Sequence, residues 1–196
     1  MPRIPRLVAD GSCHHVLSRG NNKKRIFIFP EDYVYFLELV KETLKKHLIN
    51  IYNYCPMPNH IHFLARAIQK EEFPKFFKIL LQRYAQYFTK RYNHTGHLFE
   101  NRYKSYLIEE DSYLLECARY IERNPVRSGI VAHPKDYQWS SFARYAYGKK
   151  DDIIVELNPA YLGLANNEED RQRLYEEYVS QARPYELIID KGLGIE

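Results

Sequence analysis

The sequence has few cysteines and no long apolar run, and both shortages exclude classes of protein. Cys13, Cys55 and Cys117 are far apart and odd in number, which argues against a disulfide framework and against a zinc knuckle. No apolar run approaches the ~20 residues that cross a bilayer, so no membrane span is expected. The N-terminal segment carries Arg3 and Arg6 without a continuous apolar core after them, so no secretory signal is expected. We therefore expect buried free thiols in a reducing cytoplasm.

Acidic side chains are also scarce in residues 1–150, where 25 lysines and arginines accompany 14 aspartates and glutamates. Residues 151–196 have the opposite balance, with 4 basic and 11 acidic side chains. A basic body with an acidic tail suggests a polyanionic partner, with the tail as a mimic, a regulator or a solvated end. Aromatic side chains lie among the basic ones, as binding of single-stranded nucleic acid requires, although many of the tyrosines must pack in the core. The interleaved residues are Arg83, Tyr84, Tyr87, Phe88, Lys90, Arg91, Tyr92, Arg102, Tyr103 and Lys104.

The pattern of apolar residues predicts an α+β fold with one compact domain and an extension. Strands are expected over 13–18, 49–55, 60–67 and 103–108, helices over 31–47 and 71–92, and a turn over 56–59. A third helix is expected from the capping pair Asp111–Ser112 to about Arg123, where Asn124–Pro125 ends it. This order predicts a ferredoxin-like βαββαβ antiparallel sheet with two helices on one face. The third helix can then cover the open face.

His60 and His62 form the most informative pair in the chain. Strand side chains alternate between faces, so both rings project from one face while the neighbouring apolar residues pack on the other. Two convergent neutral imidazoles suit a divalent metal, although this tripeptide alone is weak evidence for one. His14 and His15 are adjacent on another predicted strand, so at most one of them points to the same face.

Tyr120 and Asn124 lie four residues apart on the third helix and share one of its faces. An amide oxygen can complete a metal site that two imidazoles begin, and a phenol one turn away can attack a bound phosphate. Before the histidines are considered, a half-buried amphipathic tyrosine and a helix-ending asparagine explain these residues equally well.

The chain resembles the single-tyrosine HUH transposases, whose name means His-hydrophobe-His. Within them it is most similar to the REP-associated tyrosine transposases, bacterial proteins tied to repetitive extragenic palindromes. The resemblance covers residues 10–148 in the family's order, whereas residues 151–196 carry none of its motifs and form an acidic extension whose segment 168–181 is expected to be helical. The matching segments are Ser18–Asn22, Met57–Leu64, Gly96–Ser105, Arg119–Gly129 and Trp139–Phe142.

The resemblance implies a metal-dependent endonuclease and strand transferase that cleaves single-stranded DNA near hairpins, in the cytoplasm and at the nucleoid of a bacterium. His60, His62 and Asn124 would hold Mg²⁺ or Mn²⁺, and Tyr120 would form a 5′-phosphotyrosine intermediate. Insertion-sequence transposases commonly have glutamine as the third ligand. Asparagine is one methylene shorter, so the helix must lie closer or a water must bridge. The expected DNA contacts are Arg19, Asn21, Lys23, Arg102, Lys104 and Arg127.

Two other functions stay open at this point. A catalytically silent DNA-binding descendant acting on repetitive palindromes is disfavoured, because both histidines, the tyrosine and an amide ligand are present. An unrelated metal hydrolase is disfavoured because no carboxylate accompanies the histidines in the motif, Glu100 and Glu122 being the nearest candidates. Either a monomer or a homodimer is expected, since insertion-sequence relatives exchange the tyrosine helix between subunits and REP-associated relatives can act as monomers.

Overall fold

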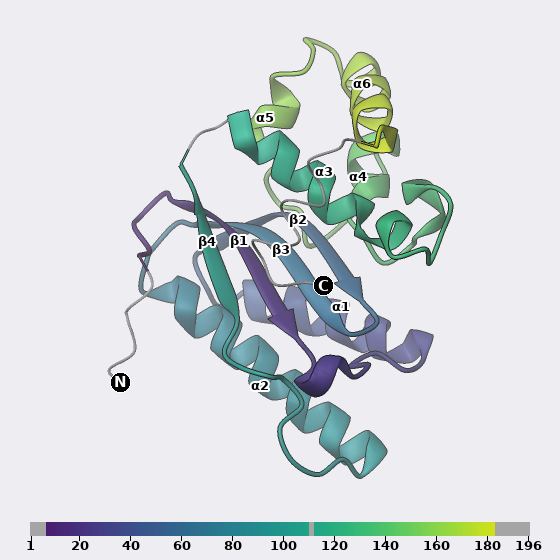
Figure 1. Ribbon diagram of the computed structural model, residues 1–196. Helices are drawn as coiled ribbons and strands as arrows, with labels where there is room; N and C mark the ends of the chain where they lie inside the picture. The colour runs from purple at the N-terminus through teal and green to yellow at the C-terminus, as the bar shows by residue number, and fades with distance from the viewer. Residues whose placement is uncertain (1–6, 110–111, 183–196) are drawn as a thin grey trace.

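The computed structural model describes residues 7–109 and 112–182. Its centre is an antiparallel sheet of four strands in the order β2-β3-β1-β4. This order, with a helix after β1 and another after β3, confirms the predicted ferredoxin-like arrangement (Figure 1). The strands are β1 (Cys13–Arg19), β2 (Ile49–Met57), β3 (His60–Ala67) and β4 (Lys104–Ile108).

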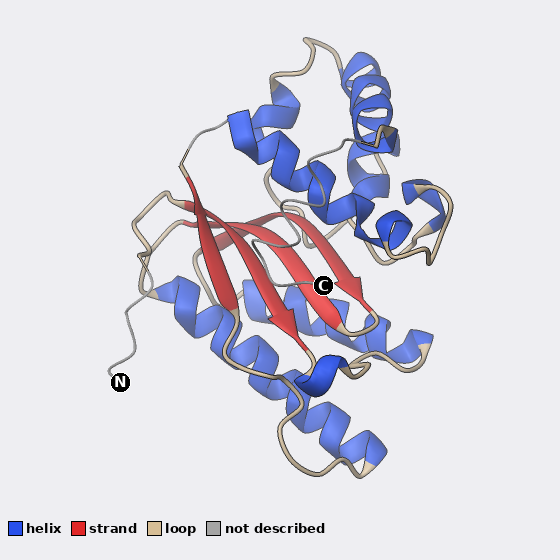
Figure 2. Cartoon of the chain, in the orientation of Figure 1, coloured by secondary structure: helices blue, strands red, loops and turns tan. Residues whose placement is uncertain are grey.

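Helices α1 (Pro30–Leu44) and α2 (Glu72–Tyr92) cover one face of the sheet, and α3 (Ser112–Arg127) lies across the other (Figure 1, Figure 2). The larger hydrophobic core fills the space under α1 and α2, where Phe36, Phe63 and Phe77 are at most 2% exposed. Burying each such ring stabilises the fold by about 1.5–3 kcal/mol. Helix α2 ends as predicted, because Asn93 takes a left-handed conformation with a φ of 47°.

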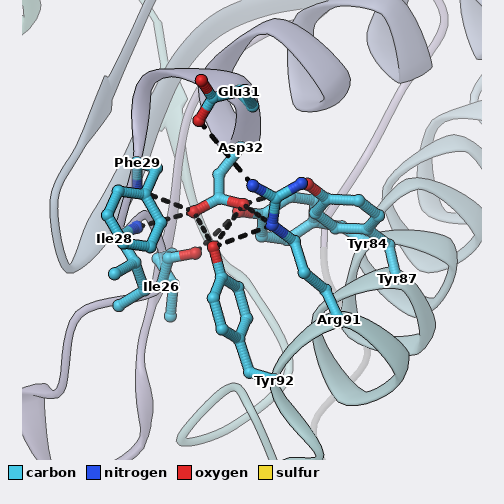
Figure 3. Close-up of polar contacts among 9 residues, drawn as sticks. All are labelled: Ile26, Ile28, Phe29, Glu31, Asp32, Tyr84, Tyr87, Arg91 and Tyr92. Atoms are coloured by element: carbon cyan, nitrogen blue, oxygen red, sulfur yellow. Dashed lines mark hydrogen bonds and ion pairs between the residues drawn. The ribbon is translucent and has the colours of Figure 1, made fainter.

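Asp32 fastens the start of α1 to the loop before it and to the end of α2 (Figure 3). Its carboxylate accepts hydrogen bonds from the backbone of Ile28 and Phe29 at 2.8 and 3.0 Å. The hydroxyls of Tyr87 and Tyr92 donate to it at 3.0 and 2.7 Å. Burial alone would raise the pKa of Asp32, but these donors together lower it. Asp32 therefore connects the preceding loop to both α1 and α2.

Helix α3 extends to Arg127, so the prediction that Asn124–Pro125 ends it is wrong. Pro125 has no N–H for the carbonyl of Ile121, which normally breaks a helix. Here the side-chain amide of Asn124 donates to the carbonyls of Tyr120 and Ile121, at 2.8 and 3.4 Å. This substitute contact allows the helix to continue for another half turn.

The other predicted bounds shift by up to three residues. The predicted turn over 56–59 shortens to Pro58–Asn59, because Pro56 and Met57 still pair with β3. Helix α1 ends at Leu44 rather than at His47. Of the predicted cap of α3, Asp111 lies outside the described residues.

The chain after α3 is helical, as predicted for the extension. Its described part contains the 3₁₀ turn η2 (Pro134–Asp136) and the helices α4 (Phe142–Tyr147), α5 (Pro159–Leu162) and α6 (Glu168–Ser180). Another 3₁₀ turn, η1 (Asn21–Lys23), lies earlier in the chain, between β1 and α1. Tyr175 and Val179 are the buried residues of α6. Leu174 and Tyr178 are half-buried.

Residues on both sides of positions 148–151 contribute to the larger core, among them Phe142, Tyr145, Ile153 and Tyr175. The division of the chain into 10–148 and 151–196 stays a prediction. All three cysteines are free, with Cys55 and Cys117 buried as expected and Cys13 half-buried. In the part of the chain that the structure describes, no helix is long and apolar enough to cross a membrane.

Candidate active site

His60 and His62 lie side by side on β3, on the sheet face that α3 covers. They are 5% and 0% exposed, and their ring centres are 4.8 Å apart with the planes nearly perpendicular. Each Nδ1 has a partner: Oδ1 of Asn59 at 2.6 Å for His60, and Nε2 of His15 at 2.9 Å for His62. Each Nε2 is buried without a hydrogen-bond partner among the described residues. Two such nitrogens on one face fit the ligand chemistry of a divalent metal ion.

Both imidazoles are neutral at physiological pH. Burial lowers the pKa of His60 to about 3, with a smaller contribution from the charge of Arg19. Burial lowers the pKa of His62 well below its usual 6.5. The neutral ring is the form that binds metals, so this pair would need no deprotonation to bind one.

A metal at this pair needs further ligands of another kind. No group of three histidines, cysteines, aspartates or glutamates suited to a metal occurs in residues 7–109 and 112–182. Asn124 is buried on α3, one turn after Tyr120, and its amide nitrogen donates to its own helix. The amide oxygen is then the end of this side chain that can serve as a ligand. The donor set of two imidazoles and one amide therefore fits a divalent ion.

Tyr120 faces the histidines from α3. Its ring centre is 5.8 Å from that of His62 and 5.6 Å from that of His15, with both pairs edge to face. The tyrosine is 2% exposed, and burial raises the pKa of its hydroxyl to about 12. A hydrogen bond from Arg127 opposes this rise. The phenol of Tyr120 thus lies close to His62, whose Nε2 is buried without a hydrogen-bond partner among the described residues.

Arg127 belongs to this centre as well as to the set of predicted DNA contacts. Its guanidinium carbon lies 5.0 Å from the centre of the Tyr120 ring. Sequence reasoning did not connect the two residues, although seven positions on a helix are two turns and bring side chains to the same face. A positive charge here favours the phenolate form of Tyr120.

The five other predicted DNA contacts gather around the His60 end of the sheet. Arg19 lies opposite His60 in the β1–β3 ladder, and its carbonyl accepts a hydrogen bond from the backbone of Glu100 at 3.0 Å. The backbone of Asn21 donates to Leu98 at 2.8 Å. These bonds join the two basic loops into one surface. Its small pocket, of about 70 Å³, is lined by Leu17, Arg19, Glu100, Asn101, Arg102 and Lys104.

Asn21 and Lys23 are exposed beside this pocket, on η1. The structure therefore places all six predicted DNA contacts near the histidine pair or the tyrosine, and their role in DNA binding stays a prediction.

His15 is the residue of the centre that sequence reasoning left unresolved. It is 5% exposed and faces α3, whereas His14 faces α2 and packs at 4.9 Å from Phe73. Only the pairing of β1 with β3 shows which of the two adjacent histidines reaches the site. For Nε2 of His62 to bind a metal, its Nδ1–H must donate to His15, so His15 selects the required tautomer.

Replacing His15 with alanine is expected to lower the affinity for Mn²⁺ by about 10–100-fold, the usual cost of losing such an outer partner. Isothermal titration of the folded protein with Mn²⁺ measures this. His14→Ala is the matched control, because the same residue type is removed from the opposite face of the same strand. Equal affinities of the two variants would refute the role of His15.

Comparison with known proteins gives three consistent matches. Residues 9–124 match the family model described as Transposase IS200 like. A REP-associated tyrosine transposase from Haemophilus influenzae is 30% identical over 135 residues, which cover 63% of this chain and 72% of that protein. The solved structure of a REP-associated tyrosine transposase bound to a REP hairpin aligns with a TM-score of 0.61 at 17% identity, over 80% of this chain and 92% of that one. At this identity the last match supports the fold.

Proposed function

The chain belongs to the IS200-like transposase family, with the REP-associated tyrosine transposases as its relatives, and on this premise we propose that it is a metal-dependent, single-stranded DNA endonuclease and strand transferase. The observation that carries the proposal is the position of Tyr120, which comes from α3 and lies 5.8 Å, ring to ring, from His62 on β3. Residues 58 positions apart in sequence converge there with orphaned nitrogen atoms. A purely structural role for Tyr120 explains neither its position over His62 nor the buried nitrogen atoms beside it.

In this proposal the hydroxyl oxygen of Tyr120 attacks the scissile phosphorus, and the bond to the 3′-oxygen breaks. The products are a 5′-phosphotyrosine and a 3′-hydroxyl, which takes up the proton that the phenol loses. Arg127 favours the phenolate and the charge that develops on the phosphate. The phosphotyrosine keeps the energy of the broken ester, so a hydroxyl can reverse the reaction and join strands.

His60, His62 and Asn124 would hold Mg²⁺ or Mn²⁺, and the bound ion would polarise the phosphate as a Lewis acid. A ligand set rich in imidazole tolerates Mn²⁺ better than it suits Mg²⁺. The protein contributes a desolvated, neutral pair of imidazoles whose orientation is fixed by Asn59 and His15.

The proposed substrate is a hairpin from a palindromic repeat, with a single-stranded segment at its foot. The relative of known structure was solved with a REP hairpin. Here the basic loops beside His60 offer phosphate contacts, and a pocket of about 330 Å³ between β4 and α3 includes His15 and Tyr120 in its lining. Such a surface lets a strand reach the tyrosine, and action on genomic repeats would place the protein at the bacterial nucleoid.

A metal hydrolase that works with a carboxylate base receives no support from the site. Glu122 accepts hydrogen bonds from Ser141, Asn53 and Tyr175 on the side of α3 away from Tyr120. Glu100 lines the small pocket among arginines and a lysine rather than joining the histidines. The silent DNA-binding descendant is left as the competing function.

A labelled single-stranded hairpin oligonucleotide with a 5′ and 3′ flank tests the proposal. With Mn²⁺ the protein should cleave one flank and retain the label in a covalent protein–DNA adduct, and the reaction should stop in EDTA. Binding of the hairpin without cleavage in any divalent metal would favour the silent descendant. Cleavage of a small phosphodiester without an adduct would favour a hydrolase.

A further inference from the structure

Helix α3 carries three buried charged residues next to Tyr120 in sequence, and none of them contacts the histidine pair through a contact described above. Arg119 and Glu122 are 0% exposed, and Arg123 is 5% exposed. Charged side chains are almost never fully buried unless they are paired, because their desolvation is costly. The proposed chemistry uses none of the three, so their burial requires a separate explanation.

The two arginines bind the C-terminal end of α6. Arg119 donates to the carbonyl of Gln181 at 2.7 Å. Arg123 donates to the carbonyls of Val179 and Ser180 at 3.1 and 2.8 Å. The last carbonyls of a helix have no partner within the helix and carry its negative dipole end. The two guanidinium groups therefore serve as the cap of α6 from another helix.

Glu122 joins α3 to three further elements. Its carboxylate accepts hydrogen bonds from Ser141 before α4 at 2.5 Å, Asn53 on β2 at 2.9 Å and Tyr175 on α6 at 2.7 Å. All four residues are fully buried. These hydrogen bonds tie α3 to β2, to α6 and to the segment before α4, and so hold its position and its rotation relative to the sheet.

We propose that Arg119, Glu122 and Arg123, which we call the α3 clamp, are positioning residues that hold Tyr120 against the histidine pair of its own chain. The two arginines of the clamp contact α6, while Tyr120, on a neighbouring face of the same helix, packs against His62 on β3 and His15 on β1. Residues 168–181 then help to position the tyrosine for catalysis, although they carry no motif of the family. This inference rests on the proposed function, because positioning matters only if Tyr120 reacts. An error of about 1 Å in the place of a reacting group can cost 10²-fold in rate.

Arg123→Met tests the clamp, because methionine keeps the apolar stem and removes the guanidinium. Hydrogen exchange of the α3 amides should accelerate at least tenfold, while the amides of β1 and β3 keep their protection. The rate of adduct formation should fall about 10–100-fold, with hairpin affinity and Mn²⁺ affinity within about twofold of wild type. Arg123→Lys should restore part of the rate, since an ammonium can still donate to Val179 or Ser180.

Arg171→Met is the matched control. Arg171 also donates to two carbonyls, those of Ala165 and Asn166, but within its own segment and not to α3. The Arg171→Met variant should leave both the hydrogen exchange of the α3 amides and the rate of adduct formation unchanged. Unaltered α3 exchange in Arg123→Met would overturn the clamp, and so would faster exchange with a wild-type adduct rate. If wild type forms no adduct at all, the proposed function fails, and the exchange measurement still decides whether the clamp holds α3.

Discussion

Tyr120→Phe is expected to abolish the covalent protein–DNA adduct, with a loss of at least ~10⁴-fold in the cleavage rate. Phenylalanine has no oxygen to attack phosphorus, whereas Tyr120 places its phenol ring edge to face with His62. The ring itself is kept, so the contacts with His62 and His15 and the packing of α3 should persist. Hairpin affinity should therefore change by less than about twofold. Denaturing gels with a labelled oligonucleotide and a binding assay on the same preparation measure the two quantities.

Tyr106→Phe is the control for this prediction. Tyr106 lies on β4, and its ring centre is 6.1 Å from that of His15. It is therefore a tyrosine at the border of the same centre, but it comes from the sheet and not from α3. Its variant should keep near wild-type cleavage. A persistent adduct in Tyr120→Phe, or a loss of cleavage of equal size in Tyr106→Phe, would show that the nucleophile is misassigned.

His62→Ala is expected to lower Mn²⁺ affinity by more than 100-fold, beyond the 10–100-fold that loss of an outer partner costs. The variant removes one of the two orphaned Nε2 atoms and leaves His60 as a single imidazole ligand. Cleavage should fall below detection at micromolar Mn²⁺ and recover only partly at millimolar concentrations. Titration calorimetry and the metal dependence of the cleavage rate measure this effect.

His47→Ala is the control for the metal prediction. His47 lies between α1 and β2 and is half-buried. Its Nδ1 is hydrogen-bonded at 2.6 Å to the carboxylate of Glu72, the first residue of α2, on the sheet face opposite to α3. It should leave the metal dependence unchanged. Full cleavage by His62→Ala at micromolar Mn²⁺, or undiminished cleavage by wild type in EDTA, would contradict the ligand assignment.

Much of the fold follows from local patterns. Alternation over His60–Ala67 and the helical spacing of Phe73, Phe77, Tyr84 and Phe88 each select one type of element, and the βαββαβ order then allows few topologies. The end of α3 was missed because a local rule about Pro125 ignores the side chain before it, which supplies the missing hydrogen bond.

Site residues can be predicted from the sequence when the proposed chemistry requires a particular residue type. His60, His62 and Tyr120 stand in the motifs that carry the family resemblance, so the sequence alone proposes their roles. His15 depends on the register between β1 and β3, which no single segment encodes. The α3 clamp depends on a packing contact between residues about 60 positions apart, such as Arg119 and Gln181. Tertiary contacts of this kind leave no periodic signal in the chain.

Mapping the site of covalent attachment tests the central claim most directly. The wild-type protein is incubated with Mn²⁺ and a hairpin oligonucleotide, then digested with nuclease and trypsin and analysed by mass spectrometry. Cleavage after Arg119 and Arg123 isolates the peptide Tyr120–Arg123, in which Tyr120 is the one hydroxyl-bearing residue. We predict a nucleotide mass on this peptide and on no other. An adduct on a different tyrosine, or none on a protein that binds the hairpin and Mn²⁺, would contradict the account.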